Sequence, residues 1–86
     1  MTSQSEIARR ANALLDRFRN QLPEKTLYGL GLMKEGGEYG ELVIELAATL
    51  AKTRTLVSRQ EQQELRVLLE ATEMPTEPVD QPVIVD

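Results

Sequence analysis

Hydrophobic side chains recur at helical spacing in four separate segments of this chain. The first segment begins at Ser3-Gln4-Ser5-Glu6, which reads as a capping box, and runs toward Pro23. Its apolar residues form a single stripe, which predicts an amphipathic helix. The members of the stripe are Ile7, Ala8, Ala11, Leu14, Leu15, Phe18 and Leu22. Proline suits the first turn of a helix and not its interior, so Pro23 ends this helix or opens the next one.

The second segment extends from Pro23 to about Glu35 and is predicted to be a helix. Its apolar positions are interrupted by Gly29 and Gly31, each of which costs a helix up to about 1 kcal/mol relative to alanine. A strand from Leu27 to Met33 is the alternative, but no partner strand is evident for it.

The third segment follows Gly36-Gly37, a pair typical of a helix end and a new helix start. A helix is predicted from Glu38 to about Thr53. Its buried stripe is broad enough to indicate the central helix of the fold. The stripe contains Tyr39, Leu42, Val43, Leu46, Ala47 and Leu50, and Ile44, Ala48 and Ala51 widen it.

The fourth segment starts at a second capping box, Ser58-Arg59-Gln60-Glu61, and is predicted to fray near Met74, before Pro75. Three prolines in residues 75–86 predict an extended or disordered tail. Its apolar run, Val83-Ile84-Val85, would pack on the bundle or pair with a partner's strand. We therefore predict an all-α fold: a small antiparallel bundle of about four helices in residues 1–74, followed by the tail 75–86.

The amino-acid composition limits the kinds of catalytic and metal site that the chain can form. The 86 residues include no Cys, His or Trp, which removes the commonest zinc ligands, thiolate chemistry and the usual proton shuttle at neutral pH. We expect no catalytic residue, no cofactor and no metal site.

The first residues lack a basic segment followed by an apolar run, and no apolar stretch approaches the length of a membrane span. We therefore expect no signal peptide and no membrane partner, and a cytoplasmic location.

Charge is distributed unevenly along the chain. Residues 1–34 carry six basic and three acidic side chains, whereas residues 35–86 carry four basic and eleven acidic ones. The acidic part argues against direct binding of nucleic acid and favours a basic partner. A patch of arginines on the first helix is the one candidate surface for nucleic acid, and a solvated helix face is the preferred interpretation of it. It consists of Arg9, Arg10, Arg17 and Arg19.

Four glutamates around the start of the third helix form the most interesting local feature. They are Glu35, Glu38, Glu41 and Glu45, and the last three share one helix face. The run is either a docking surface for a basic partner or a solvated face that the helix dipole favours near a helix start. The nearby Gly36-Gly37 and Gly40 are not followed by the lysine and hydroxyl residue that a phosphate-binding loop requires.

An ordered string of motifs resembles the small helical immunity proteins of bacterial toxin–immunity systems, of the Maf type found in contact-dependent growth inhibition. The string is GEYGELVIELAATL (Gly37 to Leu50), then Leu56-Val57-Ser58, then EQQELRVLLEATEM (Glu61 to Met74). It spans about half of the chain.

The resemblance implies a protein that binds and neutralises a cognate toxin domain, which we expect to be a nuclease with a basic active site. The expected partner-binding residues are Glu35, Glu38, Tyr39, Glu41 and Glu45, with Glu61 and Glu64 as second contributors. Tyr39 would supply an aromatic anchor. Two alternatives stay open: a homo-oligomeric helical adaptor, and a small antitoxin-like regulator that binds DNA through the first helix. The residues do not decide between a monomer and a homodimer.

Overall fold

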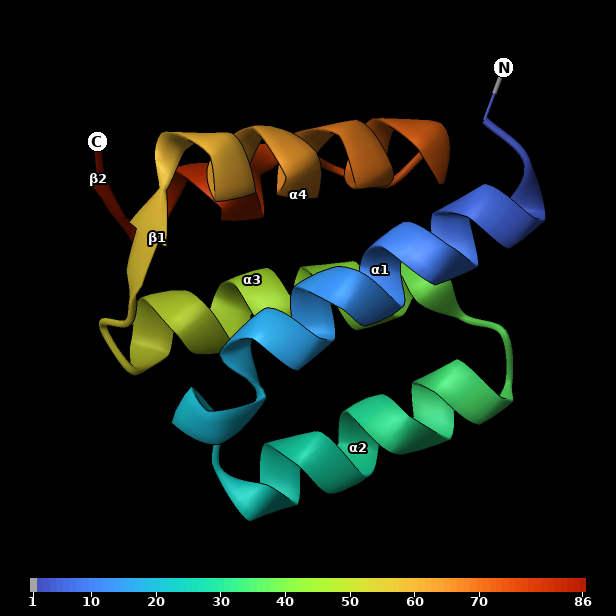
Figure 1. Cartoon of the computed structure of the whole chain (residues 1–86), viewed down its shortest axis with the longest axis horizontal. Helices are drawn as coiled ribbons and strands as arrows, with labels where there is room; N and C mark the ends of the chain where they lie inside the picture. Colours follow the sequence, from blue (N-terminus) through green and yellow to red (C-terminus); the bar gives the residue numbers. More distant parts are fainter. Residues whose placement is uncertain (1) are drawn as a thin grey trace.

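The computed structural model describes residues 2–86, which form four α-helices and one short β-sheet (Figure 1). The helices are α1 (Gln4–Phe18), α2 (Glu24–Glu35), α3 (Tyr39–Lys52) and α4 (Arg59–Ala71). Two short 3-10 helices, η1 (Arg19–Gln21) and η2 (Glu77–Asp80), and two strands, β1 (Leu56–Ser58) and β2 (Val83–Val85), complete the order. The mostly helical class is confirmed, and the strand alternative for the second segment is wrong. None of the helices in residues 2–86 combines the length and apolar character needed to span a membrane.

Helix α3 forms the centre of the molecule. It packs against α1, α2, α4 and η2, and in Figure 1 it lies between α2 on one side and α4 on the other. Five of its apolar side chains are completely shielded from solvent, as its broad stripe predicts: Leu42, Val43, Leu46, Ala47 and Leu50. Burial of such side chains is the main stabilising contribution in a domain this small.

Helices α1 and α4 start at the serines that the sequence predicts as caps. Ser3 Oγ accepts a hydrogen bond from the backbone N–H of Glu6, at 3.1 Å. The Glu6 carboxylate contacts Arg10 instead of returning to the serine, so only half of this predicted capping box is present. The box at α4 is complete: Ser58 Oγ accepts from Glu61 N–H at 3.0 Å, and Glu61 Oε1 accepts from Ser58 N–H at 2.9 Å.

Three helices end in the same way, with a residue in the left-handed backbone conformation. These residues are Gly37 after α2, Arg54 after α3 and Glu73 after α4, with φ of 72°, 56° and 59°. In each case the next residue donates its N–H to a carbonyl five residues earlier, as in Glu38 to Met33 and Met74 to Leu69. This Schellman arrangement satisfies the last free carbonyls of a helix.

The two strands pair in parallel, with Leu56 opposite Val83 and Ser58 opposite Val85. Parallel neighbours need a crossover connection, and here α4 and η2 supply it. Val57 of β1 is completely buried, and β1 packs on α4, whereas Leu56, Val83 and Val85 remain exposed.

The segment 75–86 is folded, which corrects the prediction of an extended or disordered tail. Val79 is completely buried and Pro82 is buried as well. The side-chain amide of Gln62 donates to the carbonyl of Val79 at 2.9 Å, and Arg66 pairs with Asp80 at 3.0 Å. Proline restricts φ and lowers the entropy that ordering costs, so a proline-containing segment with apolar anchors can order on a neighbouring surface. Its apolar run pairs with β1 of the same chain.

Candidate functional site

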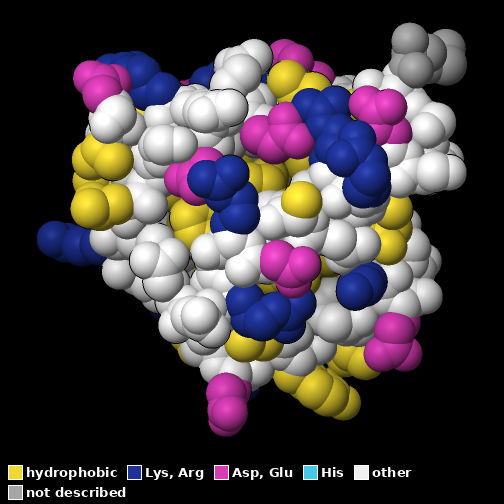
Figure 2. Space-filling model, viewed as in Figure 1, with side chains coloured by type: hydrophobic (Ala, Val, Ile, Leu, Met, Phe, Trp, Pro, Cys, Tyr) yellow, Lys and Arg dark blue, Asp and Glu magenta, His cyan; other side chains and the backbone are white. Residues whose placement is uncertain are grey.

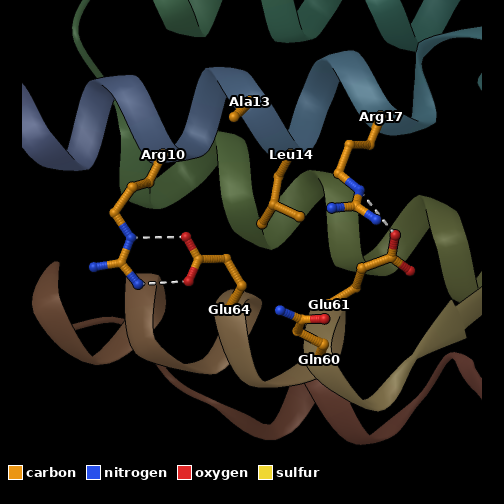
Figure 3. Close-up of a pocket in the computed structure, with 7 residues that line it drawn as sticks. All are labelled: Arg10, Ala13, Leu14, Arg17, Gln60, Glu61 and Glu64. Atoms are coloured by element: carbon orange, nitrogen blue, oxygen red, sulfur yellow. Dashed lines mark hydrogen bonds and ion pairs between the residues drawn. The ribbon is translucent and has the colours of Figure 1, made fainter. Parts of the chain in front are cut away.

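Charged side chains of α1 and α4 face one another across a hollow of about 290 Å³ (Figure 3). Arg10 Nε donates to Glu64 Oε2 at 2.7 Å, and Arg10 Nη2 donates to Glu64 Oε1 at 2.5 Å. Farther along the same groove, Arg17 Nε lies 3.1 Å from Glu61 Oε2. Figure 2 shows the result on the surface, where basic and acidic side chains alternate over α1 and α4.

The Arg10–Glu64 contact has the two-bond geometry of the strongest ion pairs. Its side chains are only 23% and 29% exposed. Hydrogen bonds from Arg10 lower the pKa of the Glu64 carboxyl below its ordinary value, although partial burial acts in the opposite direction. The same contact raises the pKa of Arg10. The pair therefore joins α1 to α4 as a structural contact, with both charges already neutralised.

We expect Glu64→Gln to lower the free energy of unfolding by about 1–2 kcal/mol at pH 7, because it leaves the partly buried Arg10 with only its longer, 3.4 Å contact to Glu6. The native-state pKa of Glu64 is depressed, so the stabilisation is complete above the ordinary carboxyl pKa of about 4.3 and is lost as the pH falls through the lower native value. The difference between the two proteins should thus stay constant from pH 7 to about pH 5 and shrink below about pH 4. Urea unfolding at a series of pH values measures it.

Asp16→Asn provides the matched control, because Asp16 pairs with Arg19 on an exposed surface. Exposed pairs of this kind contribute about 0.5 kcal/mol or less. Equal losses in the two variants would show that the α1–α4 pair has no special role.

Two residues of the predicted binding surface already have partners within the chain. Glu61 caps α4 with one carboxylate oxygen and pairs with Arg17 through the other, and Glu64 is committed to Arg10. A partner would have to break these contacts to use either carboxylate. The arginine patch is also largely occupied, because Arg10, Arg17 and Arg19 all form ion pairs within the chain.

A second hollow, of about 340 Å³, lies where the start of α3 meets the end of α4. Three of the predicted residues, Glu38, Tyr39 and Glu41, line it, and Glu73 joins them from the end of α4. Within residues 2–86 none of these three glutamates forms an ion pair. We call this set, Glu38, Tyr39, Glu41 and Glu73, the acidic groove.

The other two predicted glutamates lie elsewhere. Glu45 lines a hollow of about 400 Å³ together with Pro23, Thr26 and Lys52, between α2 and α3, and it accepts a hydrogen bond from Thr49 at 3.4 Å. Glu35 lies on the exposed last turn of α2 and lines none of these three hollows.

Sequence patterns missed Glu73, because it is 32 positions from Glu41 and only the folded chain brings the two together. Glu73 holds a left-handed conformation that Gly37 adopts at the equivalent place after α2. A side chain in this conformation costs about 1 kcal/mol or more relative to glycine.

We expect Glu73→Gly to raise the free energy of unfolding by about 0.5–1 kcal/mol, because glycine adopts this conformation without steric cost. Arg54→Gly is the matched control, since Arg54 has the same conformation after α3 and lies outside the acidic groove. Thermal unfolding of both variants measures the gain. A loss of stability in Glu73→Gly alone would mean that its carboxylate contributes to the fold.

Comparisons of the chain with models of protein families, with curated proteins and with solved structures find no match.

Proposed function

We propose that this chain is an immunity protein, which binds and neutralises a cognate toxin domain of the nuclease type through the acidic groove. The observation that carries the proposal is the convergence of Glu38, Glu41 and Glu73 on one hollow without a cationic partner among residues 2–86. The segment from Gly37 to Met74 resembles the small helical immunity proteins, and this resemblance is the reason for proposing a toxin as the partner. A nuclease acts on nucleic acid inside the cell, so the proposal includes a cytoplasmic location.

The physical basis is charge complementarity. Like charges held close together repel, and a cationic surface that approaches them relieves the repulsion. A nuclease active site is cationic because it binds phosphates, so an acidic protein is steered toward it and competes with its substrate. The half-buried side chain of Tyr39 lines the same hollow and would supply apolar contact beside the glutamates.

The groove residues are the part of the chain on which the proposal depends, and its first test uses the protein encoded immediately upstream. Co-expression of the two proteins should rescue growth and yield a complex that co-purifies. Toxicity that this chain does not relieve, with no complex formed, would contradict the proposal.

The groove itself is tested with the double variant Glu38→Lys/Glu41→Lys. We expect its affinity for the toxin to fall about tenfold to a hundredfold at moderate salt, and the salt dependence of binding to weaken, because two of the attractive charges become repulsive. Binding titrations at several salt concentrations measure both effects.

Glu24→Lys/Glu77→Lys is the matched control. It changes the net charge equally, and its two positions also lie in the first turns of helices, so the unfavourable effect of lysine on a helix start is the same in kind. We expect this control to alter affinity less than threefold. Equal losses in both double variants would indicate attraction by net charge and contradict a specific role for the acidic groove.

A further inference from the structure

The outer face of α2 is apolar at its centre and is left uncovered. Tyr28 is 72% exposed and Leu32 is 52% exposed, and they lie one helical turn apart. Figure 2 shows hydrophobic side chains projecting at the lower edge of the molecule, where α2 lies in Figure 1. On its opposite side α2 buries Leu30 completely and packs mainly on α3.

Four exposed residues of α2 are placed symmetrically along the sequence, at equal numbers of positions before and after residue 30. An α-helix turns about 100° per residue, so Tyr28 and Leu32 point about 160° and 200° away from Leu30. Lys25 and Glu35 extend the same stripe by one turn at each end, at about 220° and 140°. All four side chains are exposed. The stripe, which we call the α2 stripe, therefore reads Lys25, Tyr28, Leu32, Glu35, with a base at one end and an acid at the other.

This order makes the α2 stripe complementary to itself. When two copies of a helix pack antiparallel about a two-fold axis through residue 30, position 30 − k of one copy lies opposite position 30 + k of the other. Tyr28 then meets Leu32 of the second copy, and Lys25 meets Glu35 of the second copy. Both contacts occur twice. Within residues 2–86 neither Lys25 nor Glu35 forms an ion pair.

The two glycines of α2 fit the same arrangement. Gly29 and Gly31 flank the stripe symmetrically, and a Cβ added at either position would meet nothing within 4 Å. The fold of one copy therefore does not require glycine at these positions. Small residues beside a helix contact let a second helix approach closely. The two glycines would therefore allow a second copy of α2 to pack closely, although a single copy does not need them.

We propose that α2 is a homodimer interface, in which two copies of the chain pack α2 against α2, antiparallel, about a two-fold axis near residue 30. One pair of helices of 12 residues each makes a small interface, at the lower end of the range for specific complexes. The dimer is accordingly reversible, with a dissociation constant in the micromolar range. The α2 stripe shares no residue with the acidic groove, so this interface is independent of the proposed function.

Sedimentation velocity over concentrations from about 1 μM to 1 mM tests the interface through the apolar pair. The wild-type chain should shift from monomer toward dimer within this range. Leu32→Lys should weaken the dimer at least tenfold, whereas Leu56→Lys, at a site that is 60% exposed on β1, should leave it unchanged. A wild-type chain that remains monomeric throughout, or equal effects of the two variants, would overturn the proposal.

A charge swap tests the two-fold geometry specifically. Lys25→Glu places two pairs of like charges across the interface, and Glu35→Lys does the same with the opposite sign, so each should weaken the dimer several-fold at low salt. The double variant Lys25→Glu/Glu35→Lys restores both attractions and should recover the wild-type association. Additive weakening in the double variant would overturn the proposed pairing. Leu32→Lys should still bind the toxin, which separates a failure of the interface from a failure of the acidic groove.

Discussion

Deletion of residues 75–86 is expected to lower the free energy of unfolding by about 3–5 kcal/mol, which is comparable to the whole stability of a domain this small. The deletion removes the buried Val79 and Pro82 and exposes the apolar surfaces of α3 and α4 that η2 covers. It also leaves β1 without its partner strand. Full burial of one aliphatic side chain contributes about 1.5–3 kcal/mol, so two such losses and an unpaired strand account for the expected total. Circular dichroism at increasing temperature measures the loss.

A graded version of this experiment keeps the protein folded. Val79→Ala should cost about 1–2 kcal/mol, because it removes two buried methyl groups from a site with no access to solvent. A loss of this size lowers Tm by roughly 4–16 °C in a domain of 60–100 residues. Val83→Ala is the matched control, since Val83 is 43% exposed on the same segment, and it should cost less than about 0.5 kcal/mol. A deletion variant as stable as the full chain, or a silent Val79→Ala, would show that residues 75–86 do not belong to the folded unit.

The helices were predictable because their information is local. The stripe from Ile7 to Phe18 and the cap at Ser58 lie within a few turns of the residues that they organise, and the structure places α1 and α4 there. Leu22, the last member of the predicted stripe, lies beyond α1 in extended backbone. The fold of residues 75–86 depends instead on a surface made by α3 and α4. Three prolines suggest disorder when the segment is considered alone, and the burial of Val79 becomes evident only once that surface exists.

In the candidate site too, some residues could be identified from the local sequence and others only from the folded chain. Glu38 and Glu41 could be identified from their spacing on one helix. Glu73 could not, because the end of α4 reaches them only through the packing of α4 on α3. Arg10 and Glu64 are 54 positions apart, and nothing local distinguishes a glutamate that pairs across the fold from one that faces solvent. The acidic stretch of the sequence therefore contains both structural and unpaired glutamates, and only their surroundings separate them.

Gly40→Ala is expected to destabilise the protein by about 1–3 kcal/mol, which is the typical cost of inserting a methyl group into a filled space. A Cβ at this position would stand 2.8 Å from Cγ of Met74 and 3.0 Å from Cβ and Oγ1 of Thr72. Thr72 cannot easily move away, because its hydroxyl donates to the carbonyl of Leu68 at 2.8 Å. The substitution must therefore push the start of α3 away from the end of α4. Chemical denaturation measures the loss.

Gly29→Ala is the matched control, because it makes the same substitution at a helical glycine that has no close neighbours. Gly29 lies inside α2 with free space around it, so alanine there should raise the free energy of unfolding by about 0.5–1 kcal/mol, the difference in helix propensity. Opposite signs for the same chemical change would show that close approach of two helices, and not backbone freedom, requires glycine at position 40.

Since Gly40, Glu41 and Glu73 line the same hollow, Gly40→Ala should also weaken toxin binding by separating the two glutamates. A variant with unchanged stability would indicate that α3 and α4 are less closely packed here, and that the acidic groove is wider than the structure shows.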